Sequence, residues 1–468
     1  MSDGLMIESR SWTSRKGSVI VGGYPGFAWI GKRKIARQRR QWTFGLVSHP
    51  RMRLPIFFPL LSLICSSVMG AETPYRVMDF RAPPHNYAEH EPKDRFAALL
   101  KQIEKGEFKP DTSSDHALLR SLLQGLKIPV SSQILLFSAS SLQSEIINPR
   151  NPRALFFNED TYVGFVPGGV LEVAAADPEV GPIFYVFGRS QPGGPFPRVE
   201  RGTKCFNCHG GTATKRLPGL IAESLLVSQA GSSLETYRRD EQGHQIPLEN
   251  RFGGWHLTGG HHIAGHKANV YGLARGAGNI EKLDVIPGQT WDLAKHLMPT
   301  SDILPHLVHE HQIGFENRLV RGIYTVRQLK DDRKGMLGST ELAEIDVWAQ
   351  DFARYVLFAD EAKFPREGIE GDAAYARDFL EDRRKSKRGL SLKDLDLKTR
   401  LFRHRCSFML YTETWTHAPK EIKDRVYYRM AEALRDAQPS MPHLTAEERR
   451  SIREILKETM SDLPAWWR

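Results

Sequence analysis

Cys205, Cys208 and His209, in the stretch RGTKCFNCHGGT (201–212), have residue types and a spacing that allow them to do chemistry together. Two cysteines separated by two residues can form a redox disulfide or provide half of a zinc site. They can also attach a haem through two thioether bonds, and the histidine that follows then binds the iron. Any one of the three would make this stretch the functional centre of the chain.

The surrounding residues favour the third chemistry. A zinc site needs four ligands, whereas the chain has one C-x-x-C pair, and a redox disulfide has no use for an adjacent histidine. Further zinc ligands are offered by His256, His261, His262 and His266. With four cysteines and seventeen histidines in 468 residues, a C-x-x-C-H string is expected by chance on the order of 0.001 times. The residues therefore predict one covalent haem c, held by Cys205 and Cys208, with His209 on the iron.

Haem iron has a second axial position, and a His or Met there sets the reduction potential. The segment GGWHLTGGHHIAGHKAN (253–269) is rich in histidine and in glycine, which lets backbone approach a flat ring closely. We take His261 and His266 as the first candidates for this ligand, followed by Met298 and His311.

The stretch PHLVHEHQ (305–312) is a second unusual constellation. His306 and His309 are three residues apart, so they share a face if the stretch is helical. With Glu310 and His311 they could form a metal site or a proton-transfer pair near the haem. The simpler interpretation is a polar helix face with His–Glu contacts, because no complete ligand motif is present.

The N-terminal residues suggest export. Leu54 to Ala71 is an uncharged run of eighteen residues that follows basic residues and ends in small ones. This order predicts a signal peptide over 52–71, a basic or mis-assigned leader over 1–51, and a mature chain from about Glu72. A membrane anchor is the alternative, since about 17–25 apolar residues span a bilayer.

Charge is distributed unevenly along the chain. Residues 1–53 carry a net charge of +9 against +10 for the whole chain, which leaves about +1 for the rest. The basic character belongs to the leader, so we expect no nucleic-acid partner.

The rest of the chain predicts an α+β fold in three regions. Residues 72–153 have helical periodicity, as in 94–108 and 114–128, followed by a strand-like run at 133–138. Region 154–290 begins with runs typical of a small antiparallel sheet and continues as a loop-rich, haem-binding part. Region 291–468 is mainly helical, with helices expected over 341–359, 397–415 and 445–460. Thr445 and Glu448 predict a capping box on the last of these.

The signal and the CFNCH motif resemble a mono-haem c-type cytochrome. Several further segments resemble a group of secreted bacterial cytochrome-c-like proteins of unsettled function, and they cover most of 153–411. They are RALFFNEDTYVGFV, EVAAADPEVGPIFYVF, CFNCHGGTATKRLPG, RFGGWHLTGGHH with HKAN, SDILPHLVHEHQ and LFRHRCSFMLY. The resemblance implies a large cytochrome-like protein and no particular substrate.

We therefore expect a periplasmic or secreted cytochrome that transfers electrons to or from a redox partner protein or a small redox substrate. Peripheral membrane association stays open. Roughly 260 residues follow the haem motif, more than an electron carrier needs, so a peroxidase-like haem enzyme or a gas or redox sensor with an open iron position is the alternative. Cys406 is left without a partner and is expected to be a buried structural thiol.

Overall fold

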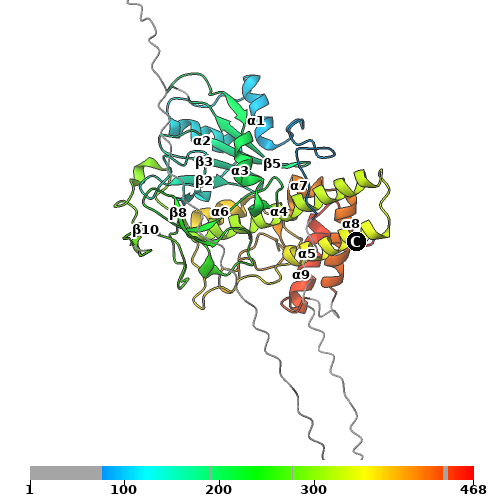
Figure 1. Ribbon diagram of the computed structural model, residues 1–468. Coiled ribbons are helices and arrows are strands. Elements are labelled where there is room, and N and C mark those ends of the chain that lie inside the picture. Colours follow the sequence, from blue (N-terminus) through cyan, green and yellow to red (C-terminus); the bar gives the residue numbers. More distant parts are fainter. Residues whose placement is uncertain (1–75, 190, 277, 436–440, 468) are drawn as a thin grey trace, which may run out of the picture. The chain divides into compact units, whose positions relative to one another are not determined.

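The structure is a computed structural model that describes residues 76–189, 191–276, 278–435 and 441–467 (Figure 1). The leader expected over 1–51 and the signal peptide expected over 52–71 lie outside these residues. All described residues belong to one compact unit. They combine α-helices with antiparallel sheets, which confirms the α+β fold class predicted from the sequence.

The largest sheet of the described chain has seven antiparallel strands in the order β6-β5-β4-β3-β2-β1-β9. Its strands are β1 (Ile134–Leu136), β2 (Arg153–Phe157), β3 (Thr161–Phe165), β4 (Glu172–Asp177), β5 (Gly181–Phe187), β6 (Val199–Arg201) and β9 (Trp255–His256). Strands β2 to β5 fall where β-branched and aromatic residues alternate with turn residues, as predicted. The sheet is larger than expected, because β1, β6 and β9 extend it on both sides.

The two faces of this sheet are covered by different helices. Successive side chains of a strand point to opposite faces. Val163 accordingly packs into a core with α1 (Arg95–Glu104) and α2 (Asp115–Gly125), whereas its neighbour Tyr162 packs into a core with α4 (Ile303–Asp332). In the view of Figure 1, α2 lies above β2 and β3, and α4 lies below them. The helices predicted over 94–108 and 114–128 are thus confirmed as α1 and α2.

Helix α4 is 30 residues long, and most of its side chains are buried. It begins after Asp302, whose carboxylate accepts a hydrogen bond of 2.9 Å from the Leu304 N–H and so caps the helix. A helix that is buried around most of its circumference can only lie inside the fold. This helix carries the PHLVHEHQ stretch into the core.

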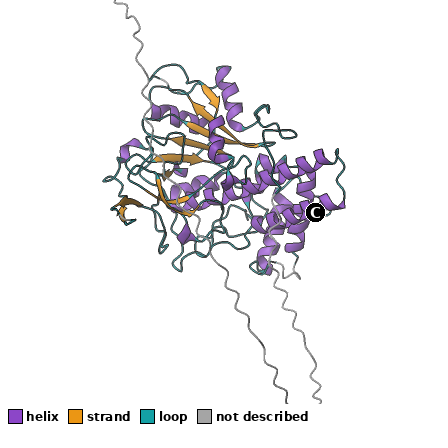
Figure 2. Cartoon of the chain, viewed as in Figure 1, coloured by secondary structure: helices purple, strands orange, loops and turns teal. Residues whose placement is uncertain are grey.

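The C-terminal region is helical, as predicted, and Figure 2 shows most of the helices that follow α4 at the lower right, apart from the strands. Its helices are α5 (Ser339–Val356), α6 (Ala373–Glu381), α7 (Glu413–Thr416), α8 (Lys420–Ala433) and α9 (Ala446–Thr459). Thr445 caps α9 by accepting a hydrogen bond of 3.1 Å from the Glu448 N–H. The Glu448 side chain forms an ion pair with Arg405 instead of returning to the cap, so half of the expected capping box is formed.

The helix expected over 397–415 is wrong over most of its length. The chain there forms turns, a short 3-10 helix (Phe408–Tyr411) and α7. The Asp396 carboxylate accepts hydrogen bonds from the N–H groups of Lys398 (2.9 Å) and Thr399 (2.7 Å), and Leu397 has a φ of 58°. An aspartate that binds nearby backbone groups competes with helix formation, which explains the turn.

The stretch between β5 and α4 is loop-rich, as expected, but it also contains two hairpins. Strands β7 (Ser224–Val227) and β8 (Ser233–Arg238) form one, and β10 (Val270–Ala274) and β11 (Ile280–Asp284) form the other. The CFNCH motif lies ahead of both, in α3 (Phe206–His209). Among the described residues, no helix is both long enough and apolar enough to cross a membrane.

Candidate functional site

The CFNCH motif forms one continuous helical turn. Cys205 ends a short 3-10 helix and is followed directly by α3, so Cys205, Cys208 and His209 stand at positions i, i+3 and i+4. Residues with this spacing share a face of a helix. Phe206 points elsewhere and anchors the turn, with its ring 5.4 Å from that of Phe184 and at similar distances from Phe80 and Tyr87.

His209 is held in one orientation and one tautomer. Its Nδ1 lies 2.8 Å from the carbonyl oxygen of Gly219. A carbonyl can only accept, so Nδ1 carries the proton and Nε2 is left with a free lone pair. Burial lowers the pKa of His209 to about 4, which keeps the ring neutral near pH 7. A neutral imidazole whose other nitrogen donates to a carbonyl is the form in which histidine binds metals.

The three motif residues line a cavity of about 390 Å³. This volume lies within the range of about 300–1,000 Å³ that ligand and cofactor sites occupy. Much of its wall is apolar and comes from the sheet, the loops and α4: Leu136, Leu155, Phe184, Leu220, Trp255 and Ile313. A flat apolar ligand would be desolvated there beside two thiols and an imidazole.

A partly buried ion pair lies in the same cavity. Arg153 of β2 and Glu172 of β4 meet across β3 at 2.7 Å, and both line the cavity. Gly164 of β3 makes this possible, because a Cβ at that position would lie 2.3 Å from an Arg153 nitrogen. The Arg153 Nε is buried and has no hydrogen-bond partner. The pair supplies a cation and a carboxylate to an otherwise apolar wall.

Three histidines of α4 have different surroundings. His306 Nε2 lies 3.0 Å from Ser301 Oγ, and His311 is bonded to His244 and Ser407, at 2.8 Å each. His309 lines the cavity instead. His306 and His311 are thus buried and bonded to serine and histidine side chains, and Glu310 pairs with Arg238, so the simpler interpretation of a polar helix face with His–Glu contacts is wrong.

The His309 ring has aromatic neighbours and is free to bind something else. It lies 5.4 Å from Phe157, 5.7 Å from Tyr162 and 5.9 Å from Trp255, and it is 4% exposed. Its nitrogens have no hydrogen-bond partner among the described residues. Burial lowers its pKa to about 3, so the ring is neutral near pH 7. The ring lines the cavity, so a ligand there would supply the missing partner.

The sequence candidates for the second axial ligand lie elsewhere. His261 and His266 are neighbours, with ring centroids 4.7 Å apart, and neither lines the cavity; nor does Met298. The Nδ1 of His261 accepts from the Ile263 N–H and that of His266 from the Ala268 N–H, each at 3.2 Å. Since neutral imidazole has one proton, it is then on Nε2, opposite to His209. The structure brings His209 together with His309 instead.

The alternative chemistries of the cysteine pair find little support in the geometry. Burial raises the pKa of Cys205 to about 11 and also raises that of Cys208, whereas redox-active pairs have a lowered thiol pKa. For zinc, the described residues contain no group of three or more His, Cys, Asp or Glu placed to hold a metal ion. Cys406 is completely buried, and burial raises its pKa, as expected for a structural thiol.

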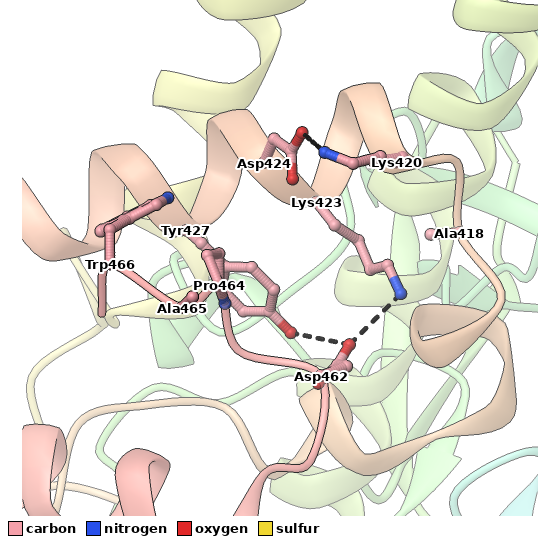
Figure 3. Close-up of a pocket in the computed structure, with 9 residues that line it drawn as sticks. All are labelled: Ala418, Lys420, Lys423, Asp424, Tyr427, Asp462, Pro464, Ala465 and Trp466. Carbon is pink, nitrogen blue, oxygen red and sulfur yellow. Dashed lines mark hydrogen bonds and ion pairs between the residues drawn. The ribbon is translucent and has the colours of Figure 1, made fainter. Parts of the chain in front are cut away.

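A second cavity, of about 610 Å³, lies between α8 and the C-terminal segment (Figure 3). Its charged side chains are paired within it. Asp462 accepts a hydrogen bond from the Tyr427 hydroxyl at 3.0 Å and binds Lys423 at 3.3 Å, while Lys420 pairs with Asp424. Among the described residues that line it, none has a buried polar atom without a partner, and we assign it no site.

The sequence analysis names His309 as part of a cluster but does not predict that it lines the cavity. It does not predict Arg153 and Glu172 as site residues. His309 is one of three histidines within residues 306–311, and helical spacing alone does not say which one faces a cavity. Gly164 was a signal for the ion pair, because an isolated glycine inside a strand often marks a close approach.

Comparisons of the chain with known proteins found no matching family model, no matching curated protein and no matching solved structure. The resemblance to c-type cytochromes stays a prediction that rests on the motif residues.

Proposed function

We propose that the chain is a c-type cytochrome whose single covalent haem occupies the 390 Å³ cavity. Cys205 and Cys208 would hold the haem covalently, and His209 and His309 would bind its iron. The observation that carries this proposal is that two neutral histidines, one from the CFNCH motif and one from α4, line the same cavity. One has a free Nε2, and the other has no partner for either nitrogen.

The two thiols can make the attachment without an oxidant. Each S–H would add across one vinyl group of the porphyrin, with the sulfur bonding to the carbon nearer the ring and the hydrogen going to the outer carbon. No electrons are gained or lost, so the cysteines must start as thiols. Cys205 and Cys208 are both free in this structure, which is compatible with that requirement.

The polar pair in the cavity suits the charged edge of a haem. The haem carries two propionates, and a guanidinium is a favoured partner of carboxylates. Arg153 has a buried Nε that lacks a hydrogen-bond acceptor. Glu172, which already neutralises Arg153, keeps the site from becoming strongly cationic before the haem arrives.

Two histidine ligands would define the function. With both axial positions taken, substrates cannot reach the iron, and electron transfer through the haem edge is the chemistry that remains. Histidine in place of methionine lowers the reduction potential. We propose an electron carrier at low potential that works with a redox partner protein in the periplasm or outside the cell, where covalent haem attachment and export coincide.

A haem enzyme or gas sensor is the second candidate, and one observation favours it. Arg153 and Glu172 lie in the cavity wall and could move protons or stabilise charge beside the iron. This candidate requires that His309 does not bind the iron, or leaves it readily.

Visible spectra of the full chain, exported in a host that attaches haem c, test the proposal. We expect a haem band that survives acid extraction and a reduced spectrum that carbon monoxide does not change. His261→Ala and His266→Ala serve as controls and should leave the spectrum as it is. A spectrum that shifts with carbon monoxide would favour the enzyme or sensor, and a colourless protein would reject both.

A further inference from the structure

The loop after His209 is closed on itself by two hydrogen bonds. His209 Nδ1 donates to the Gly219 carbonyl at 2.8 Å, and the Gly219 N–H donates to the His209 carbonyl at 3.0 Å. The Thr214 hydroxyl, within the loop, adds a third contact to the His209 carbonyl at 3.3 Å. The position of the imidazole therefore depends on the position of Gly219.

Gly219 is in turn fixed by α4 through its neighbour Leu220. The Asn317 side chain accepts a hydrogen bond of 2.8 Å from the Leu220 N–H and donates one of 2.8 Å to the Leu220 carbonyl. The approach is close, because a Cβ on Gly219 would lie 2.8 Å from the Asn317 Oδ1. Two parallel hydrogen bonds to one residue define its orientation as well as its distance.

Asn317 and His309 belong to the same buried helix. They are eight residues apart, which corresponds to about 12 Å along the axis. One end of this stretch carries the proposed second ligand, and the other holds the loop that orients the first. We infer that Asn317 is a positioning residue, which sets the ring of His209 relative to His309 so that one rigid helix determines both axial ligands.

This inference rests on the proposed function, and it makes a separate claim. The haem can be present and bound by both histidines without Asn317 having any influence on it. Partners that orient a metal ligand from outside typically change metal affinity or activity about 10–100-fold when they are removed. Asn317 does not contact His209 itself. It binds Leu220, and the carbonyl of the neighbouring Gly219 accepts the hydrogen bond from His209.

The chain contains a matched control. Asn269 makes the same pair of hydrogen bonds to Leu257, accepting from its N–H and donating to its carbonyl at 2.8 Å each. It lies in the histidine-rich segment outside the cavity lining. Asn269 has a φ of 63°, so Asn269→Gly removes the side chain without adding backbone strain.

The experiment compares Asn317→Ala with Asn269→Gly in the full, haem-loaded chain. Both should lose thermal stability, because each loses two hydrogen bonds. Asn317→Ala alone is expected to shift the reduction potential and to raise the carbon monoxide affinity of the reduced protein by about 10-fold or more.

Gly219→Ala tests the same junction without removing a hydrogen-bonding group, in case Asn317→Ala does not fold. Its Cβ would meet Asn317 Oδ1 at 2.8 Å and Thr214 at 2.9 Å, so it should shift the potential in a folded protein. Equal potentials and carbon monoxide affinities in wild type, Asn317→Ala and Gly219→Ala would overturn the inference, whatever the loss of stability. A wild type without haem would instead overturn the proposed function.

Discussion

The cavity beside the CFNCH motif and the segment 253–269 both combine histidines with glycines, yet they differ in what the histidines do. In the cavity, His209 donates from Nδ1 to a carbonyl, and His309 has no partner. In the segment, His261 and His266 accept at Nδ1 from backbone N–H groups two residues on. Hydrogen bonding, rather than the number of histidines, distinguishes a site ready for a metal from one that is already satisfied.

The largest effect that should distinguish the cavity from the segment 253–269 is loss of the cofactor. Replacing both motif cysteines, as Cys205→Ala with Cys208→Ala, removes both thioether anchors and should abolish covalent haem completely. The check is haem staining after denaturing electrophoresis. Cys406→Ala is the control: it removes a buried thiol far along the chain and should lower stability by about 1 kcal/mol while the haem stays attached.

The next effect concerns stability against acid. Burial lowers the pKa of His309 to about 3, below its value of about 6.5 in an unfolded chain. The unfolded state therefore binds this proton first, and the free energy of unfolding should fall as the pH falls from about 6.5 towards 3. The slope is about 1.4 kcal/mol per pH unit for one such histidine.

Urea unfolding of the double cysteine variant, which has no covalent haem, measures this slope between pH 7 and pH 5. His309→Gln should reduce it by about the contribution of one histidine. His261 is only half-buried, and burial also lowers its pKa. His261→Gln should therefore reduce the slope less than His309→Gln does. Equal reductions would contradict the distinction between the two regions.

The smallest expected effect is electrostatic. Reduction makes the haem less positive, so the cation of Arg153 favours the reduced form and the carboxylate of Glu172 opposes it. Arg153→Met should lower the midpoint potential and Glu172→Gln should raise it, each by up to about 60 mV. Arg198 and Glu200 form a similar pair at 2.9 Å that is largely exposed, and their variants should leave the potential unchanged.

The sequence predicted the fold class well because its signals were local. The periodicity of 94–108 and 114–128 produced α1 and α2, and the alternating runs after Arg153 produced β2 to β5. The helix over 397–415 failed because the Asp396 side chain binds the backbone ahead of it, and hydrophobic spacing does not register such a turn.

The candidate site was predictable only in part, for a related reason. The CFNCH motif is contiguous, so its chemistry can be recognised from neighbouring residues. His309, Arg153 and Gly219 come to the motif through the tertiary fold, from α4, from β2 and from a closed loop. Choosing His309 over His306 required the hydrogen bonds of all three α4 histidines, which no sequence pattern contains.

The most direct test of the central claim is ligand rescue at His309. The His309→Gly variant of the haem-loaded chain should bind carbon monoxide in its reduced state, and added imidazole should restore the wild-type spectrum and compete with carbon monoxide for the iron. This result would identify His309 as the second axial ligand. An unaltered spectrum in His309→Gly, together with carbon monoxide binding in His261→Ala or His266→Ala, would contradict the account and return the ligand to the segment 253–269.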